Sequence, residues 1–179
     1  MLIENVKAKI QNEIMQIEKR TDISDDEKRS KIIHIFSVTC AALAVQPIPF
    51  ADYFILTPVQ GFMGTRLSAI RGMPLSDQEA IVLVKELAGV AGIGVLAQQA
   101  ALGLYKVGLP GLAGFTTIPL VYGLTYATGR VMDLYLEKKS KKQTMSGVDI
   151  KKAWAQARKE GAAQGRKAKK EVQAKKANL

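Results

Sequence analysis

The sequence predicts an all-α protein: a helical bundle that contains a Gly/Ala-rich apolar hairpin and ends in a basic C-terminal tail. Apolar residues recur at steps of three or four, the period of an α-helix. Two Ser residues are followed three positions later by Glu, as in helix capping boxes. The charge is uneven. Residues 1–31 hold seven Lys/Arg and seven acids, residues 32–136 five of each, and residues 137–179 fourteen against four, so this tail carries the whole net charge of +10.

The first twenty residues predict an amphipathic helix, which we treat as a separate N-terminal element covering residues 1–23. Its apolar stripe is expected to pack on the body of the protein, with a helix lying on a membrane surface as the alternative. The residues of this stripe are Ile3, Val6, Ile10, Ile14 and Ile17.

A second helix is expected from Asp25 to about Val45. Ser24 and Glu27 form a candidate capping box at its start. Pro47 is expected to end it, because the residue before a proline is disfavoured in the α region. Pro47 and Pro49 together predict an extended link.

The next helix is expected from Tyr53 to Ile70, with Asp52 as its N-cap. Pro58 removes one internal hydrogen bond, which predicts either a kink or a later start capped by Thr57. Gly72 is the expected left-handed residue that ends the helix.

Ser76 and Glu79 form a second capping box, and the stretch from Leu87 to Leu109 behind it is nearly free of charge. A second apolar run, Ala113 to Tyr126, follows a Gly/Pro turn. The two arms approach the length of about 20 residues that a membrane crossing needs. Small residues four apart favour close helix packing in lipid; these pairs are Ala88/Gly92, Ala97/Ala101 and Gly123/Ala127.

A soluble, Gly-rich core hairpin is the alternative to a membrane hairpin. Gln98 and Gln99 lie in the middle of the first arm, and Lys106 lies near the turn. A lysine at the centre of a bilayer costs about 2.5–3.5 kcal/mol. Arg130 and Asp133 mark the polar end of the second arm and of the predicted membrane-associated domain, residues 24–136.

The basic tail, residues 137–179, predicts one further helix that begins near Ser146 and holds Trp154. Residues 155–179 show no apolar stripe and are expected to be a frayed helix or disordered. Cations beside a membrane segment favour anionic lipid headgroups as contacts. The tail lacks the aromatic residues of single-strand binders, which disfavours nucleic acid. The candidate contacts are Lys138, Lys139, Lys141 and Lys142.

The residue types of common catalytic and cofactor sites do not occur in useful patterns. The chain has no Gly-x4-Gly-Lys-Ser/Thr phosphate loop. His34 and Cys40 are the only histidine and cysteine, and they lie six residues apart, so they cannot form a zinc site by themselves. We therefore predict a protein that is not an enzyme and has no cofactor, with Cys40 as a buried free thiol.

The run Pro47-Ile48-Pro49-Phe50-Ala51-Asp52, followed by Leu56, Gln60, Met63 and Gly72, resembles the YcjF-like domain of unknown function. That domain occurs in bacterial inner-membrane proteins and at the C-terminal end of some Era/Ras-like GTPases. The resemblance covers roughly residues 25–136 and implies a helical, membrane-linked module that works with a GTPase, here a separate chain. In this motif Pro49 would redirect the chain and Asp52 would cap a helix. Gln60 would satisfy a buried polar group or contact a partner.

The sequence thus predicts a non-enzymatic protein of the cytoplasmic membrane, with its N- and C-terminal parts on the cytoplasmic side, as the basic segment favours. It would be an anchor or accessory partner of a GTPase or another cytoplasmic protein, bind membrane lipid and associate with itself. One alternative is a membrane-remodelling or pore-forming helical protein. Another is a soluble bundle that binds nucleic acid through its basic tail.

Overall fold

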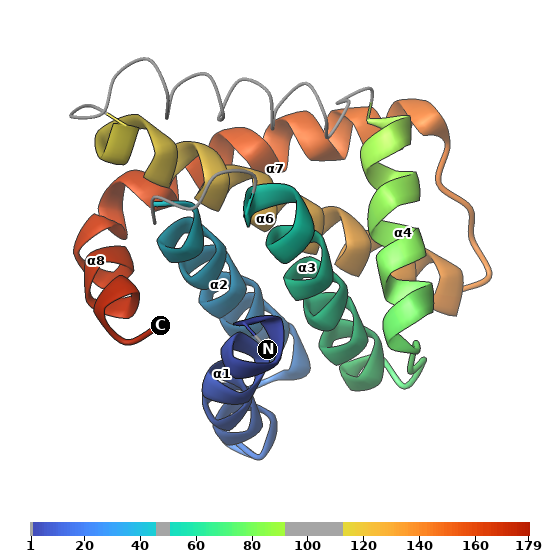
Figure 1. Ribbon diagram of the computed structural model, residues 1–179. Coiled ribbons are helices and arrows are strands. Elements are labelled where there is room, and N and C mark those ends of the chain that lie inside the picture. Colours follow the sequence, from blue (N-terminus) through green and yellow to red (C-terminus); the bar gives the residue numbers. More distant parts are fainter. Residues whose placement is uncertain (1, 46–50, 92–112) are drawn as a thin grey trace.

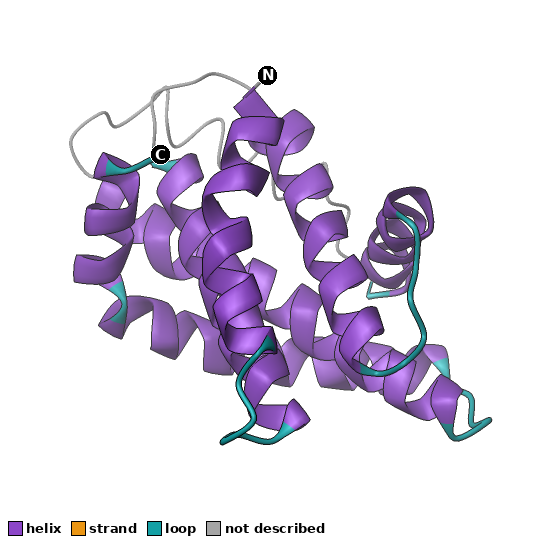
Figure 2. Cartoon of the chain, turned by 90° about the horizontal axis from the view of Figure 1, so that it is seen from below, coloured by secondary structure: helices purple, strands orange, loops and turns teal. Residues whose placement is uncertain are grey.

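The computed structural model describes residues 2–45, 51–91 and 113–179, and every regular element in these ranges is an α-helix (Figure 2). The expected all-α class is confirmed. The helices, in chain order, are α1 (Leu2–Glu18), α2 (Asp25–Ala44), α3 (Ala51–Ile70), α4 (Asp77–Val90), α6 (Ala113–Ser140), α7 (Gly147–Lys167) and α8 (Lys169–Ala177).

Helix α6 is the centre of the bundle, because α2, α3, α4, α7 and α8 all contact it (Figure 1). α2 and α3 cross it side by side, α4 packs beside α3, and α1 packs on α2 and α3. The expected burial of the α1 stripe is confirmed at Val6, Ile10 and Ile14, which are almost completely buried. The largest fully buried side chains include Phe36 and Tyr122.

The capping residues predicted at the helix ends are largely confirmed. Ser24 caps α2 by accepting a bond from the Glu27 amide, although the Glu27 carboxylate lies 3.4 Å from Lys31. Ser76 and Glu79 form the complete capping box of α4. Gly72 ends the α3 segment with a φ of 69°, the left-handed conformation that glycine adopts without strain.

The expected start of the third helix was wrong. α3 begins at Ala51, two residues before the predicted start, so Asp52 lies in its first turn rather than at the N-cap. Pro58 lies inside the helix, as in the predicted range Tyr53 to Ile70, and the alternative start capped by Thr57 is excluded. A proline costs a helix one backbone bond, but neighbouring packing can hold the helix together across it. Val59, directly after Pro58, is completely buried.

Much of the predicted hairpin lies outside the described residues. α4 ends at Val90, so it contains only the first four residues of the predicted first arm. Pro47, Pro49, Gly92, Ala97 and Ala101 all lie outside the described ranges, as does the predicted turn. α6 includes the second arm and continues to Ser140. Within residues 2–45, 51–91 and 113–179, no helix combines the length and the apolar character that a membrane crossing requires.

The polar end predicted for the second arm is instead a buried ion cluster. Asp133 is only 7% exposed, and its Oδ1 lies 2.9 Å from Arg29 Nε and 2.6 Å from Arg71 Nε. Glu137 lies 3.4 Å from Arg71, and Asp26 pairs with Arg29. The cluster therefore joins α2, α3 and α6. Burial of these charges is tolerated because each charge has an opposite partner.

The helix predicted to begin near Ser146 and to hold Trp154 is confirmed as α7. The expectation of a frayed or disordered segment does not hold for residues 155–177, which lie in α7 and α8. α7 packs along α6, and the contact is made by small residues. A Cβ atom on Gly161 would lie 2.9 Å from Gly123 Cα, so the two backbones almost touch. Small side chains allow such an approach, but they carry little hydropathy, and the sequence therefore shows no apolar stripe.

Candidate anionic-surface site

Helix α7 is held with one side toward α6. Five buried residues follow one another at steps of three or four and so share one side of the helix; they are Ile150, Trp154, Ala157, Gly161 and Gly165. The start of α7 is fixed by a capping box, in which the Asp149 amide donates to Ser146 Oγ at 3.1 Å and the Ser146 amide donates to Asp149 Oδ2 at 3.1 Å. The hydrogen bond from the Ser146 side chain is the main reason why the pKa of Asp149 lies below its ordinary value.

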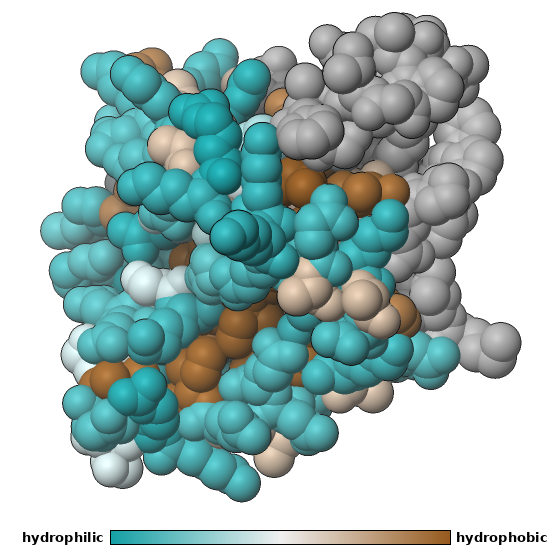
Figure 3. All heavy atoms as spheres, turned by 90° about the vertical axis from the view of Figure 1, so that its left-hand side faces the viewer, coloured by the Kyte–Doolittle hydropathy of each residue, from teal (hydrophilic) through white to brown (hydrophobic). Residues whose placement is uncertain are grey.

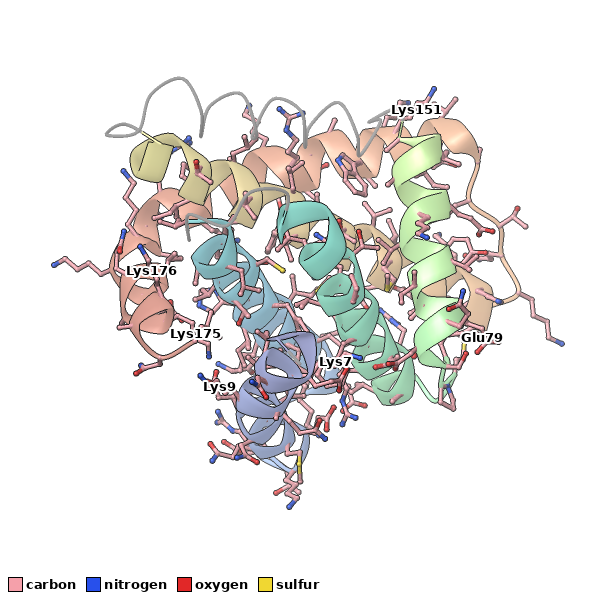
Figure 4. The ribbon with its side chains drawn as sticks, in the orientation of Figure 1. Lys7, Lys9, Glu79, Lys151, Lys175 and Lys176 are labelled. Carbon is pink, nitrogen blue, oxygen red and sulfur yellow. The ribbon has the colours of Figure 1, made fainter. Side chains whose placement is uncertain are left out.

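The outer side of α7 carries three pairs of exposed cations, which we call the basic face: Lys151 and Lys152, Arg158 and Lys159, and Arg166 and Lys167. The pairs are spaced seven or eight residues apart, about two helical turns, so corresponding members of the pairs follow one another along the helix. Lys152, Lys159 and Arg166 lie opposite the buried residues, and the six cations together cover about half of the helix circumference. The basic face is about 24 Å long from Lys151 to Lys167, at about 1.5 Å per residue. Figure 4 shows Lys151 at its beginning, on the outer edge of the bundle.

The cations of the basic face are not neutralised within the described part of the chain, where none of the six forms an ion pair. Glu160, the acid nearest to them in sequence, accepts a hydrogen bond from Gln156 at 3.0 Å. Asp149 is engaged in the cap of the helix. The six cations outnumber the two acids of α7, Asp149 and Glu160, so this surface has a net positive charge that attracts anionic groups.

The four lysines predicted as contacts lie in the last turn of α6 and in the segment that leads from α6 to α7. Lys138 is half-buried and donates to Gln143 Oε1 at 3.1 Å, and Lys141 donates to Glu137 Oε1 at 2.6 Å. Lys139 and Lys142 are exposed. Lys142 forms the turn with a φ of 55°, a position that glycine usually takes. Two of the four lysines thus already have polar partners.

The other candidate residues lie apart from the basic face. Gln60 is half-buried on α3 and donates through Nε2 to Thr125 Oγ1 at 3.3 Å. Thr125 is completely buried on α6, so this bond satisfies a core hydroxyl within the chain. Gly123 and Ala127 are buried on α6. The side chain of Asp52 lies outside the described residues.

His34 and Cys40 take part in packing between helices. His34 Nδ1 lies 2.6 Å from Tyr122 Oη, and its Nε2 lies 3.0 Å from both carboxylate oxygens of Glu171. Cys40 is completely buried, and burial raises the pKa of its thiol to about 12. In the described ranges of the chain, no three His, Cys, Asp or Glu side chains are grouped so that they could hold a metal ion.

The fold and this surface define the class of the protein: an all-α bundle whose outer helix α7 presents an ordered band of cations. Comparison of the chain with protein-family models, with curated proteins and with solved structures gave no match.

The sequence contained a signal for the basic face, namely cation pairs at a spacing of seven to eight residues in a run of helix-forming residues. That spacing places charges on one side of a helix whenever the helix forms. It was overlooked because residues 155–179 were expected to be frayed or disordered.

Proposed function

We propose that the protein is a non-enzymatic, membrane-associated accessory protein whose basic face contacts the anionic headgroups of the cytoplasmic membrane. The observation that carries the proposal is the band of six exposed cations on α7, none of which forms an ion pair within the described ranges. A band of charges along the exposed side of a packed helix suits a negatively charged surface. The cations of a lipid-bound protein gain about 1 kcal/mol each near such a surface.

The strength of this contact follows from the number of charges. Six cations at about 1 kcal/mol each give at most about 6 kcal/mol, which corresponds to a dissociation constant on the order of 10–100 μM. Such binding is reversible and weakens as salt is added, because exposed charges are screened beyond about 10 Å at 0.1 M. The predicted hairpin, most of which lies outside the described residues, would add a stronger attachment.

The accessory role rests on the resemblance of residues 25–136 to the YcjF-like domain. By that resemblance the protein partner is a separate GTPase, and the basic face would bring the chain and this partner to the same membrane. The proposed accessory protein would also associate with itself, as the sequence analysis predicts.

Binding to lipid vesicles tests the contact. The full chain is mixed with phosphatidylcholine vesicles that either contain or lack phosphatidylglycerol, and bound protein is measured by co-sedimentation. Replacing Lys152 and Lys159 with Gln should weaken binding to the anionic vesicles about 30-fold, from about 1 kcal/mol per cation. The matched control replaces Lys19 and Lys85, exposed lysines of other parts of the chain, with Gln and should bind nearly as well as the wild type.

Three outcomes would contradict the proposal. Equal binding to both vesicle types would mean that headgroup charge does not matter, and equal loss in the two double variants would mean that only net charge matters. Absence of vesicle binding together with tight, salt-sensitive binding of duplex DNA would favour the nucleic-acid alternative. Release of a dye trapped inside the vesicles would favour the membrane-remodelling alternative.

A further inference from the structure

Helix α8 is joined to α7 through a single residue whose backbone is nearly helical. Ala168 has φ −78° and ψ 4°, and α8 begins without a side-chain cap. An α-helix has ψ of about −42°, so a rotation of about 45° at this residue would make α7 and α8 one straight helix. Alanine is the best helix former, so the straight form is locally favourable.

In the folded-back form α8 covers an apolar strip of α2 and α6 (Figure 1), which we call the α8 seat; it consists of Val38, Ala41, Ala42, Ile118 and Tyr122. Val172 of α8 is completely buried in this seat, and Ala168 is 8% exposed. The side of the molecule that carries α8 is seen face-on in Figure 3, where polar residues cover most of the surface.

Polar residues of α1 and α2 around the seat form hydrogen bonds and ion pairs with residues of α8 and the C-terminus. Glu171 contacts His34 of α2, and Lys175 pairs with Glu13 of α1. Lys9 of α1 donates to the carbonyl oxygens of Asn178 at 2.9 Å and Leu179 at 2.7 Å. Figure 4 shows Lys9 and Lys175 between α1 and the lower end of α8.

The hydroxyl of Tyr122 connects the seat to α2 and α7 through polar contacts. It lies 2.6 Å from His34 Nδ1 and donates to Gln164 Oε1 of α7 at 3.3 Å. Burial, with the charge of Glu171 as a smaller cause, raises the pKa of this hydroxyl. The seat is therefore a shaped and charged surface that the body of the protein provides, and α8 is the helix that fits it.

We infer that the seat also accepts α8 of a second copy of this chain, so that two copies exchange their α8 helices in a two-fold symmetric dimer. In such a dimer every contact between α8 and the seat is kept, and only the backbone at Ala168 and the separation of the two chains change. An exchange of this kind is a low-cost route to a dimer, because it uses an interface that already exists. This inference stands independently of the proposed membrane contact.

Two charge-reversed variants test the exchange. In Glu13→Lys, α1 and the α8 of the same chain both carry a lysine where they meet beside the seat, and in Lys175→Glu both carry an acid. Each variant therefore disfavours the folded-back form. In a mixture, exchange brings the two substituted side chains, of opposite charge, together beside one seat and restores the original pair of Glu13 and Lys175 beside the other. The mixture should therefore form a heterodimer at least about tenfold more tightly than either variant forms a homodimer, since two repulsive pairs become attractive. The masses are measured by light scattering during size-exclusion chromatography.

The matched control is the single chain that carries both Glu13→Lys and Lys175→Glu. This chain restores an attractive pair within one copy, and it should be folded and behave like the wild type. Two results would overturn the inference: a mixture in which both variants stay folded without forming the heterodimer, or a heterodimer that is no tighter when Lys175→Glu is mixed with Glu13→Lys than when it is mixed with wild type.

Discussion

Replacement of Gly161 with Ala tests the close contact between α6 and α7. An added Cβ would lie 2.8 Å from Tyr126 Cβ and 2.9 Å from Gly123 Cα. These atoms belong to or adjoin the backbone, so they cannot rotate away, and α7 would have to move from α6. Overpacking of this kind costs about 1–3 kcal/mol, whereas alanine gains about 0.5–1 kcal/mol over glycine inside a helix.

We therefore expect Gly161→Ala to lower the free energy of unfolding by about 1–2 kcal/mol. For a chain of this size the midpoint of thermal unfolding would fall by about 2–4 °C for each kcal/mol. The assay is urea unfolding followed by circular dichroism, with thermal unfolding as a second measurement.

Gly89 supplies the control for this substitution. It lies in α4, and within the described part of the chain no atom beyond its two neighbours and its own helix backbone lies within 4 Å of a Cβ built on it. Gly89→Ala should therefore raise the free energy of unfolding by about 0.5–1 kcal/mol through helix propensity alone. If Gly161→Ala stabilised the protein as much as Gly89→Ala, the reasoning about the α6–α7 contact would be refuted.

Three further predictions concern buried and capping groups. Asp133→Asn should destabilise the fold by about 3 kcal/mol, because the buried Arg29 and the half-buried Arg71 lose their shared carboxylate, while Asp22→Asn, at an exposed pair, should change urea unfolding little. The pKa of Asp149 is lowered in the folded state, mainly by the Ser146 side chain, so its stabilising effect is present above the ordinary Asp pKa and is lost as the pH falls below it. The hydrogen-exchange protection factors of the first turn of α7, which are corrected for the pH dependence of intrinsic exchange, should fall between about pH 5 and about pH 3 in the wild type. Ser146→Ala should lose most of this dependence. Cys40 is buried and its thiol pKa is raised to about 12, so at about pH 8 a thiol reagent should label the native protein only slowly and the urea-unfolded protein at once.

The parts of the fold that the sequence predicted well are those set by neighbouring residues. Ser76 and Glu79 form a capping box wherever a helix starts beside them, and Gly72 is suited to the left-handed turn that follows α3. The stripe of α1 is buried because its spacing alone places it on one side. No contact with a distant segment is needed for any of these predictions.

The parts that could not be predicted depend on distant residues. Asp133 was interpreted as the polar end of an apolar segment, because the arginines that neutralise it lie more than sixty positions earlier in the sequence. Residues 155–179 were expected to be frayed or disordered because they show no apolar stripe, and Gly161 and Gly165 have no side chains that could form one. These two glycines are favourable only in the folded bundle, where they allow Gly123 and Tyr122 of α6 to pack closely against α7.

The two sides of α7 are linked through this packing. An unpacked segment with the same cations would lose conformational entropy when it bound a charged surface. α7 is already ordered by its glycine-lined contact with α6, so the attraction of its cations is not reduced by an ordering cost at binding. Repulsion among the six cations opposes the helix, and the buried side of α7, from Ile150 through Trp154 to Gly165, offsets that repulsion. The residues that hold α7 in place thus make its basic face a fixed band of charges.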